Sequence, residues 1–563
     1  MKPQSYTIKL LFLSLRRLRL KIFIILIFKV NFTMDKKISR RTFLGTTAGA
    51  AAAFTVIPNI AMGSVLGHRA PSDKLNVAVV GPAGRAGGIL NSSAAAGENI
   101  TALCETDWQR GAAVFGRYPN AKRYSDWRKM LDEMGNSIDA VVVGTPDHNH
   151  AIISARAITM GKHVYCEKPL THSVYESRLL TKLAEKHRVA TQMGNQGSSD
   201  AGVRQICDWI ADGQIGDVTK VECATNRPIW PQGLNPLGPQ GHFVPDTLNW
   251  DCWIGPAKMV PYFADYTPFA WRGWWAFGTG ALGDMACHIM HPIFKALKLG
   301  YPTKVQGSST ALLADCAPVS QKVKLTFPAR TQLNTTKVKY PEVEVVWTDG
   351  GVLPEYPKGW PDGKIWDAGL EGPVIFHGTK DKLICGCYGR NPWLLSGRTP
   401  SSPKTQREIP TPPAPVAPPP PPAAASNDPF AAFNEGGTPE NRARVQRIEP
   451  HTYDWLRACK ESPENRVQPA SYFGEAGPFN EMVVMGVLAV RLQGLNRELL
   501  WDGPNMQFTN IGEDDTIRWI NSLGVGAGNM QRNMGEPMNA KATAEELIKH
   551  TYRDGWSLPP MPA

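Results

Sequence analysis

The feature that most constrains the fold is a short apolar run that leads directly into a glycine-rich turn, "LNVAVVGPAGRAGG" (75–88). Four further β-rich runs follow, separated by amphipathic, helix-like stretches. These runs are "NITALCE" (99–105), "IDAVVVGTP" (138–146), "KHVYCEKP" (162–169) and "VATQMGN" (189–195). Alternating strands and helices predict a parallel sheet with helices on both faces. We therefore expect an α/β domain of the Rossmann type over residues 72–195.

The character of the sequence changes from about residue 217. Strand-like runs such as "KVKLTFP", "VEVVWTDG" and "DKLICGCYG" are joined by long loops rich in Gly, Pro and Trp. They predict an α+β domain over residues 196–563, with a large, open and predominantly antiparallel sheet. A proline-rich insert near 402–440 includes "IPTPPAPVAPPPPPAAAS" (409–426), which can form neither a helix nor a central strand.

The formal net charge of +11 lies in the first 70 residues, which contain twelve lysines and arginines and one acidic residue, Asp35. The rest of the chain is formally neutral, so we expect no nucleic-acid partner. Residues 1–71 are predicted to be a leader. They contain "SRRTFLGTTAGAAAAFTVIPNIAMG" (39–63), in which twin arginines precede a mildly apolar stretch and small residues, as in a twin-arginine export signal. We expect export, for example to the periplasm, a chain start at Met34, and no membrane span in the mature protein.

The turn after the first strand is suited to a dinucleotide. Ligands bind doubly wound sheets at the carboxyl ends of the strands, and glycines there let a pyrophosphate approach a helix N-terminus. Ala83 and Ala86 stand where the usual G-x-G-x-x-G pattern has glycine. About twenty residues on, Glu105 ends the second strand, where an acid binds a ribose 2′-hydroxyl and repels a 2′-phosphate. Alone, the glycine turn could be purely structural and Glu105 could be a solvated carboxylate. Together, the turn and Glu105 predict a site for NAD, with NADP less favoured.

The other strand ends also carry polar groups, in "GTPDHNHA" (144–151), "CEKPL" (166–170) and "MGNQG" (193–197). Successive strand ends of a parallel sheet face one cleft. Pro169 ends its strand, so that Glu167 can meet the cofactor while Lys168 reaches toward the reacting carbon. The ten cysteines form no C-x-x-C pair, and no metal site is predicted.

These motifs, with "NWDCWIGPA" (249–257), "GALGDMACH" (280–288) and "YRDGWSL" (552–558), resemble those of the Gfo/Idh/MocA oxidoreductases, relatives of glucose–fructose oxidoreductase and inositol dehydrogenase. The resemblance covers about residues 74–401 and 450–557. It implies an NAD(P)-dependent oxidoreductase acting on a sugar or glycoside hydroxyl. It also implies a C-terminal segment that returns to the first domain, and a homo-oligomer. The predicted cofactor-binding residues are Gly81, Ala83, Gly84, Arg85, Glu105, Thr145, Pro146, His150, Glu167, Lys168, Asn195 and Gln196.

The resemblance also implies the catalytic residues. The lysine of the family's E-K-P tripeptide contacts the substrate hydroxyl and the nicotinamide, a role that falls on Lys168, and the family's D-x-x-x-H pair falls on Asp284 and His288. Residues four apart share a helix face, and a carboxylate beside an imidazole can assist loss of the hydroxyl proton. Alone, such a pair is more often a cap or a surface hydrogen bond.

An aromatic run precedes the predicted catalytic helix. Trp271, Arg272 and Trp275 are predicted to contact the sugar, although aromatic loops also fill cores. No acceptor pool recycles nicotinamide outside the cytoplasm, so we expect tightly bound NAD that regains its oxidation state in each cycle. Lys168, helped by His288, would take the hydroxyl proton as hydride leaves.

Three reaction schemes follow from a cofactor that stays bound. One pairs the oxidation of one sugar with the reduction of another. A second is redox-neutral cleavage of a glycoside through oxidation, elimination and reduction, as in the related NAD-dependent α-N-acetylgalactosaminidases. A third is oxidation of a glycoside to a 3-keto sugar, with the electrons passed to an acceptor. A non-catalytic nucleotide- or sugar-binding protein is the alternative from another class.

Overall fold

The computed structural model describes residues 73–364, 372–416, 447–526 and 529–562. The predicted leader and most of the proline-rich insert, residues 417–446, lie outside the described residues. No helix in the described ranges is both long and apolar enough to cross a membrane.

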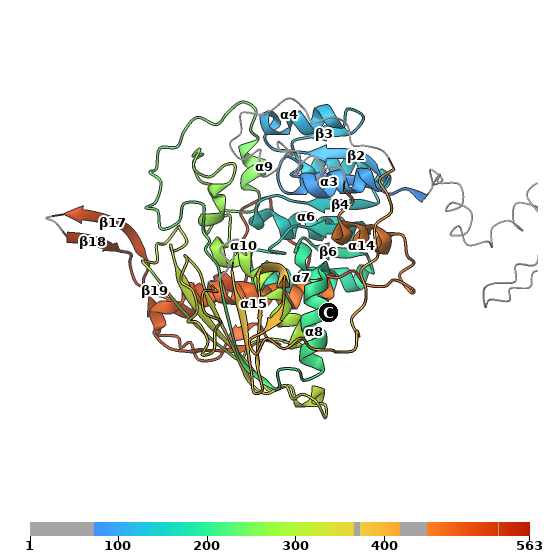
Figure 1. Cartoon of the computed structure of the whole chain (residues 1–563). Helices are drawn as coiled ribbons and strands as arrows, with labels where there is room; N and C mark the ends of the chain where they lie inside the picture. Colours follow the sequence, from blue (N-terminus) through green and yellow to red (C-terminus); the bar gives the residue numbers. More distant parts are fainter. Residues whose placement is uncertain (1–72, 365–371, 417–446, 527–528, 563) are drawn as a thin grey trace, which may run out of the picture. The chain divides into compact units, whose positions relative to one another are not determined.

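The predicted parallel sheet is present. It has six strands in the order β3-β2-β1-β4-β5-β6, and every neighbouring pair is parallel (Figure 1). The strands are β1 (Asn76–Val80), β2 (Asn99–Cys104), β3 (Lys122–Tyr124), β4 (Ala140–Val143), β5 (His163–Cys166) and β6 (Thr191–Met193). The strand order reverses between β1 and β4, which places the ligand-binding crevice of such a sheet at their carboxyl ends.

Helices cover both faces of this sheet because its strands are apolar on both sides. They are α3 (Ala86–Ala95), α4 (Trp108–Arg117), α5 (Trp127–Met134), α6 (His150–Thr159) and α7 (Val174–His187). Along β1, Val77 and Val79 join the core formed with α3 and α4. The alternate residues Ala78 and Val80 join the core formed with α5, α6 and α7. The predicted α/β class is confirmed for this domain.

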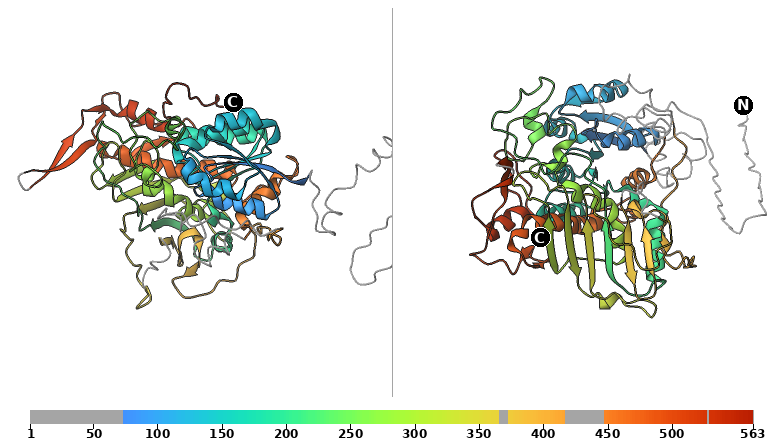
Figure 2. Two further views of the ribbon diagram at one scale, coloured as in Figure 1. Left: turned by 90° about the horizontal axis from the view of Figure 1, so that it is seen from above. Right: turned by 60° about the vertical axis from the view of Figure 1, so that its left-hand side comes forward.

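The second sheet has nine strands in the order β13-β12-β11-β7-β10-β9-β8-β14-β15. They are β7 (Val218–Ala224), β8 (Lys304–Ser309), β9 (Gln321–Phe327), β10 (Val343–Thr348), β11 (Val374–Gly378), β12 (Lys382–Cys385), β13 (Trp393–Leu394), β14 (Leu499–Asp502) and β15 (Gln507–Phe508). Only the β7–β10 pair of this sheet is parallel. The right-hand view of Figure 2 shows these strands side by side. The predicted, mostly antiparallel α+β sheet is confirmed.

The other α-helices of the described residues follow the first sheet in the chain. They are α8 (Ala201–Ala211), α9 (Trp250–Ile254), α10 (Gly280–Ile289), α11 (His291–Ala296), α14 (Pro450–Cys459), α15 (Phe473–Arg491) and α16 (Ala540–Ile548). The long helix α15 packs against α7 of the first sheet and against β8 and β9 of the second. One apolar core therefore continues from one sheet to the other.

Two small ribbons complete the described structure. The pair β16 (Thr516–Ile517) and β19 (Met538–Asn539) is antiparallel, as is the hairpin of β17 (Ile520–Gly526) and β18 (Asn529–Met534). The hairpin extends away from the rest of the second domain in Figures 1 and 2.

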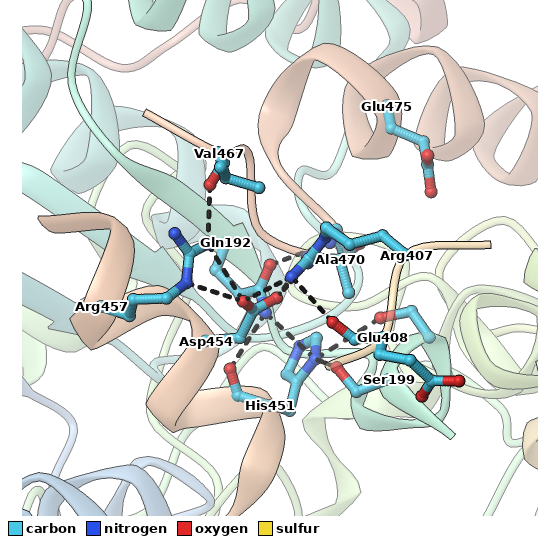
Figure 3. Close-up of polar contacts among 12 residues, drawn as sticks. Gln192, Ser199, Arg407, Glu408, His451, Asp454, Arg457, Val467, Ala470 and Glu475 are labelled. Atoms are coloured by element: carbon cyan, nitrogen blue, oxygen red, sulfur yellow. Dashed lines mark hydrogen bonds and ion pairs between the residues drawn. The ribbon is translucent and has the colours of Figure 1, made fainter. Parts of the chain in front are cut away.

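A buried carboxylate joins helix α14 to the proline-rich insert and to the segment before α15 (Figure 3). Asp454, which is 0% exposed, accepts hydrogen bonds from Nη2 of Arg407 at 2.6 Å and from Nη2 of Arg457 at 3.1 Å. The main-chain N–H of Ala470 donates to the same carboxylate at 3.0 Å. Arg407 belongs to the described part of the proline-rich insert, which continues to Val416, where the N–H donates to the carbonyl of Ala95 at 3.0 Å. The insert therefore connects α8 with α14 and α3.

His451 adds a second attachment of α14. Its Nε2 lies 2.8 Å from the carbonyl oxygen of Met193, and its Nδ1 lies 2.7 Å from Oγ of Ser199. Burial lowers the pKa of His451 to about 4, so the ring is neutral at neutral pH. A neutral ring can donate to the carbonyl and accept from the hydroxyl, which satisfies both nitrogens.

We expect Asp454→Ala to lower the free energy of unfolding by about 1–3 kcal/mol, because it leaves the buried main-chain N–H of Ala470 without its acceptor and removes the ion pairs to Arg407 and Arg457. Asp132→Ala is the matched control. It removes the exposed carboxylate of the Arg156–Asp132 pair, whose side chains are 52% and 63% exposed, and should cost about 0–1 kcal/mol. Urea unfolding of both variants measures the difference. Equal losses would show that Asp454 does not secure α14.

Candidate active site

The glycine turn after β1 lies against the end of β4. Gly81 has a φ of +76°, in the left-handed region that glycine favours, and a Cβ there would lie 2.7 Å from the carbonyl oxygen of Gly144. Across the turn, Glu105 accepts the main-chain N–H of Ala83 at 3.2 Å and that of Asp107 at 3.3 Å. The predicted ribose-binding acid therefore lies directly beside the predicted phosphate-binding turn.

Glu105 is buried at the end of β2. Burial raises the pKa of its carboxyl, and the nearby charge of Arg110 and the two N–H donors oppose that shift. A buried carboxylate accepts hydrogen bonds from hydroxyls and repels a phosphate.

Three buried polar atoms at this edge lack a hydrogen-bond partner among the described residues. They are Oγ1 of Thr145, Oδ1 of Asn195 and Nδ1 of His288. Thr145 follows β4 and Asn195 follows β6, so both flank the crevice at the carboxyl ends of the strands. Buried polar atoms are normally paired, and a nicotinamide dinucleotide offers hydroxyl and carboxamide groups that could pair them. Together with the turn at Gly81, these atoms fit the cofactor predicted from the sequence.

The loop after β5 is tied to the loop after β4. Nδ1 of His150 lies 2.7 Å from the carbonyl oxygen of Pro169, and its Nε2 lies 2.8 Å from the carbonyl oxygen of Thr145. Burial lowers the pKa of His150. This predicted cofactor-binding residue therefore joins the segment that carries Lys168 to the segment that carries Thr145 and Pro146.

Glu167 points into the same group of residues. Its Oε1 accepts from Nε2 of Gln196 at 3.4 Å and lies 3.8 Å from Nε of Arg85. Burial raises the pKa of Glu167, while the charges of Arg85 and Lys168 lower it. The structure thus brings together Arg85 from the glycine turn, Glu167 from the E-K-P tripeptide and Gln196 from the segment after β6.

Lys168 and Asp284 form an ion pair between the two domains. Nζ of Lys168 donates to Oδ1 of Asp284 at 2.6 Å and to its main-chain oxygen at 3.0 Å, and Nε of Arg272 donates to the same Oδ1 at 3.1 Å. Burial raises the pKa of Asp284, but the charges of Lys168 and Arg272 outweigh it and hold that pKa well below its usual range. Asp284 is therefore a carboxylate that orients two cations.

His288 lies one turn after Asp284 on α10, as the spacing predicts. The side chain is buried, and burial and the charge of Lys168 lower its pKa well below the usual range. The imidazole is therefore neutral and able to accept a proton. Its ring centroid lies 4.6 Å from that of Tyr388, a residue with a φ of +65°. Sequence reasoning missed Tyr388, since it lies 100 residues after His288 and no spacing connects the two.

Asp147 is a second residue that sequence reasoning passed over, although it lies within the quoted motif "GTPDHNHA". Its Oδ2 accepts from the hydroxyl of Thr279 at 2.8 Å and from the N–H of Thr279 at 3.1 Å. Burial raises the pKa of Asp147 to about 7, against the opposing hydrogen bonds and the charges of Arg272 and Lys168. The contact joins the loop after β4 to the start of α10.

The three predicted substrate residues separate in the structure. The guanidinium of Arg272 pairs with Asp284 and lies 4.4 Å from the ring centroid of Trp271, which is only 7% exposed. Trp275 instead lies beside Arg491, with 5.1 Å between the guanidinium carbon and the ring centroid. Only Arg272 is thus placed beside the ion pair, and Trp271 packs beneath it.

Comparison with known proteins matches two regions to family models. Residues 75–195 match an oxidoreductase family's NAD-binding Rossmann fold, and residues 202–336 match that family's C-terminal α/β domain. Both models are those of the Gfo/Idh/MocA oxidoreductase family. The NAD cofactor predicted from the sequence is confirmed by the first match.

Individual relatives match over shorter regions. Levoglucosan dehydrogenase of Pseudarthrobacter phenanthrenivorans is 25% identical over 189 residues, which is 33% of this chain and 40% of that protein. Inositol 2-dehydrogenase 1 of Saccharopolyspora erythraea is 30% identical over 130 residues, 23% of this chain and 38% of that protein. The matched regions thus span about two fifths of these relatives. A WlbA dehydrogenase structure from Bordetella pertussis, 15% identical, covers 76% of this chain and 99% of its own at a TM-score of 0.46.

Asp147→Asn should make stability less sensitive to pH. Because the folded pKa of Asp147 is about 7 and its ordinary value is 3.8, the folded protein retains a proton that the unfolded chain loses. This contribution is present at low pH and is lost as pH rises toward 7. We expect the melting temperature of the variant, relative to wild type, to increase from about pH 4 to about pH 7 and then stay level. A difference independent of pH would contradict the assignment.

Proposed function

We propose that the protein is an NAD-dependent oxidoreductase that oxidises a hydroxyl of a sugar or glycoside and keeps its cofactor bound between turnovers. The observation that carries the proposal is the Lys168–Asp284–Arg272 ion cluster beside His288, next to the NAD-binding edge of the first sheet. The named functions of the relatives, which act on levoglucosan and inositol, support a polyhydroxylated substrate. Preference for NAD over NADP is proposed from Glu105 beside the glycine turn.

The proposed chemistry divides the work between two side chains. Bound NAD supplies the hydride acceptor. Lys168 already donates to two oxygens of Asp284, and its third N–H can donate to the substrate oxygen and stabilise the alkoxide as it develops. Neutral His288 accepts the hydroxyl proton, and the charge of Asp284 favours the imidazolium that forms. This differs from the sequence-based expectation that Lys168 itself takes the proton.

Redox-neutral glycoside cleavage is the second candidate. It needs another proton-transfer group, because a base must remove the C–H proton beside the new ketone before the aglycone leaves. Tyr388, whose ring lies against His288, is the group that favours this candidate. Water would then add to the unsaturated ketone, and a hydride returned from bound NADH would restore the hydroxyl, so that the cycle hydrolyses the glycoside with no net oxidation.

The twin-arginine signal supports the proposal that the protein is exported, for example to the periplasm, with NAD already bound. We also propose a homo-oligomer in which the outer face of the nine-stranded sheet is covered by another copy. Light scattering on the purified protein tests the oligomer, and the N-terminal sequence of the mature protein tests export.

Lys168→Ala should lower kcat/KM for sugar oxidation by about 100- to 10,000-fold, because the positive hydrogen-bond donor at the substrate oxygen is lost. Bound NAD should remain, since the glycine turn and Glu105 are unchanged. Lys186→Ala, an exposed lysine near the end of α7, is the matched control and should behave as wild type. Near-normal turnover of Lys168→Ala would refute the catalytic assignment.

A panel of nitrophenyl glycosides and free sugars separates the candidates. With no nucleotide added, nicotinamide absorbance and phenol release are followed together. For the oxidoreductase we expect one reduced nicotinamide per site, renewed only when an acceptor sugar is added. Many turnovers of phenol release without lasting reduction would establish glycoside cleavage. Bound nucleotide with neither signal across the panel would favour a non-catalytic binding protein.

A further inference from the structure

Arg491, the last residue of α15, is a buried arginine whose side chain lacks an acceptor. The residue is 6% exposed, and its Nε is buried without a hydrogen-bond partner. Arg117 and Arg330 are also buried with an unpaired nitrogen, but each donates elsewhere: Nη1 of Arg117 to Asn91 at 3.4 Å and Nη1 of Arg330 to Pro328 at 2.6 Å. Among the described residues, no hydrogen bond or ion pair satisfies the Arg491 side chain. Burying a charged side chain without a hydrogen-bond acceptor or a counter-ion is unfavourable.

Two tryptophans pack around the guanidinium. The guanidinium carbon of Arg491 lies 3.7 Å from the ring centroid of Trp519 and 5.1 Å from that of Trp275. Aromatic rings stabilise a cation through their faces. They are poor hydrogen-bond acceptors for the N–H groups of the guanidinium, because those groups point along the guanidinium plane. Nε1 of Trp275 is also buried and has no partner. A guanidinium and an indole N–H thus lie together without acceptors.

Two neutral histidines, His172 and His550, are close enough to Arg491 for its charge to affect their pKa values. The rings of His172 and His550 lie 4.7 Å apart, and Nε2 of His172 lies 3.1 Å from the carbonyl oxygen of Gly278. Burial lowers the pKa of His172 to about 3 and that of His550 to about 4, and the charge of Arg491 lowers both further. Burial lowers the pKa of Arg491 itself to about 9, so it remains charged at neutral pH.

One carboxylate acts on Arg491, that of Asp315. This residue is exposed, and it makes no hydrogen bond to the guanidinium in the described structure. Its main-chain oxygen instead accepts the N–H of Trp275 at 2.9 Å. Asp315 therefore reduces the local positive charge without supplying the missing acceptor.

We propose that this cluster of side chains, Arg491, Trp275, Trp519, His172 and His550, binds an oxyanion, either a carboxylate or a phosphate group. The fork of an arginine matches both groups, and a charge-assisted hydrogen bond is the strongest that a buried donor can make. The indole N–H of Trp275 adds a third donor.

The cluster shares no residue with the predicted cofactor-binding set. Trp275 lies three residues after Arg272, and His172 contacts the carbonyl of Gly278 on the segment that leads into α10. An oxyanion bound there contacts the segment that positions Arg272 beside Asp284. The inference does not depend on the proposed sugar oxidation, because Arg491, Trp519, His172 and His550 have no assigned part in that reaction.

Thermal unfolding with inorganic phosphate, at constant ionic strength, tests the proposal. Phosphate stabilises proteins in general by exclusion from their surface, so each variant is compared with wild type at the same concentrations. Arg491→Gln removes the charged fork, and Arg497→Gln is the matched control because Arg497 is a more exposed arginine paired with Asp515. We expect a saturable rise in Tm of about 2 °C in wild type and Arg497→Gln. In Arg491→Gln that saturable component should be absent.

Asp315→Asn distinguishes a bound oxyanion from an internal counter-ion. If Arg491 binds an oxyanion, removing the competing carboxylate should lower the phosphate concentration at half-saturation. If Asp315 is the real partner, this variant loses stability and phosphate has no saturable effect on wild type, which would overturn the proposal. Identical phosphate responses in all four proteins would overturn it as well.

Two further arms complete the test. The same thermal unfolding is repeated with glucuronate, and with glucose as its neutral counterpart, to distinguish an oxyanion carried by a sugar from free phosphate. A saturable rise in Tm with glucuronate or with phosphate, and none with glucose, supports the site. If Arg491→Gln does not fold, Trp275→Phe removes the indole N–H and should raise the half-saturating phosphate concentration several-fold. An unchanged half-saturation point in Trp275→Phe would overturn the assignment of that donor.

Discussion

The functional arrangement depends on a buried carboxylate held between two cations. Asp284 lies on α10 of the second domain. Its charge is balanced by Arg272 and by Lys168, and Lys168 follows a strand of the first domain. Neither cation has another carboxylate at hydrogen-bond distance in the described structure, so the pairing of the three charges depends on this arrangement of the two domains. The positions of the reacting groups therefore depend on how the two sheets are placed. The ion cluster also leaves one N–H of Lys168 free to donate to a substrate oxygen.

Burial then assigns different roles to residues of the same type. His288 is neutral, because burial and a neighbouring cation both disfavour its charged form, and the charge of Asp284 acts in the opposite direction, in favour of a bound proton. His150 and His451 are also buried, but their ring nitrogens contact main-chain oxygens and join segments of the fold. The acids divide similarly. Asp284 stays charged beside two cations, whereas Asp147 has a pKa of about 7, since hydrogen bonds to Thr279 only partly offset its burial.

Much of the site was predictable because its residues follow strands of a regular sheet. The glycine turn, Glu105, the loop after β4 and Lys168 each end a βα unit, and parallel strands bring such ends to one edge. That Lys168 and Asp284 belong to one site came only through a family resemblance, and their ion pair was not predicted, since 116 residues separate them. Tyr388 was not predictable, because nothing in its local sequence indicates that its ring packs on His288. The contact of Trp275 with Arg491 was also not predictable, because the two residues are far apart in the chain.

The sequence by itself determined the alternation of strands and helices, the position of the nucleotide-binding turn and the register of Asp284 and His288 on one helix. These are local properties, set by side-chain periodicity and by glycine and proline. Tertiary structure alone decided which distant groups meet: Asp454 with an arginine of the proline-rich insert, and Arg491 between two tryptophans. The physical reason is that charge pairing and burial depend on distances through space, which the order of residues along the chain does not specify.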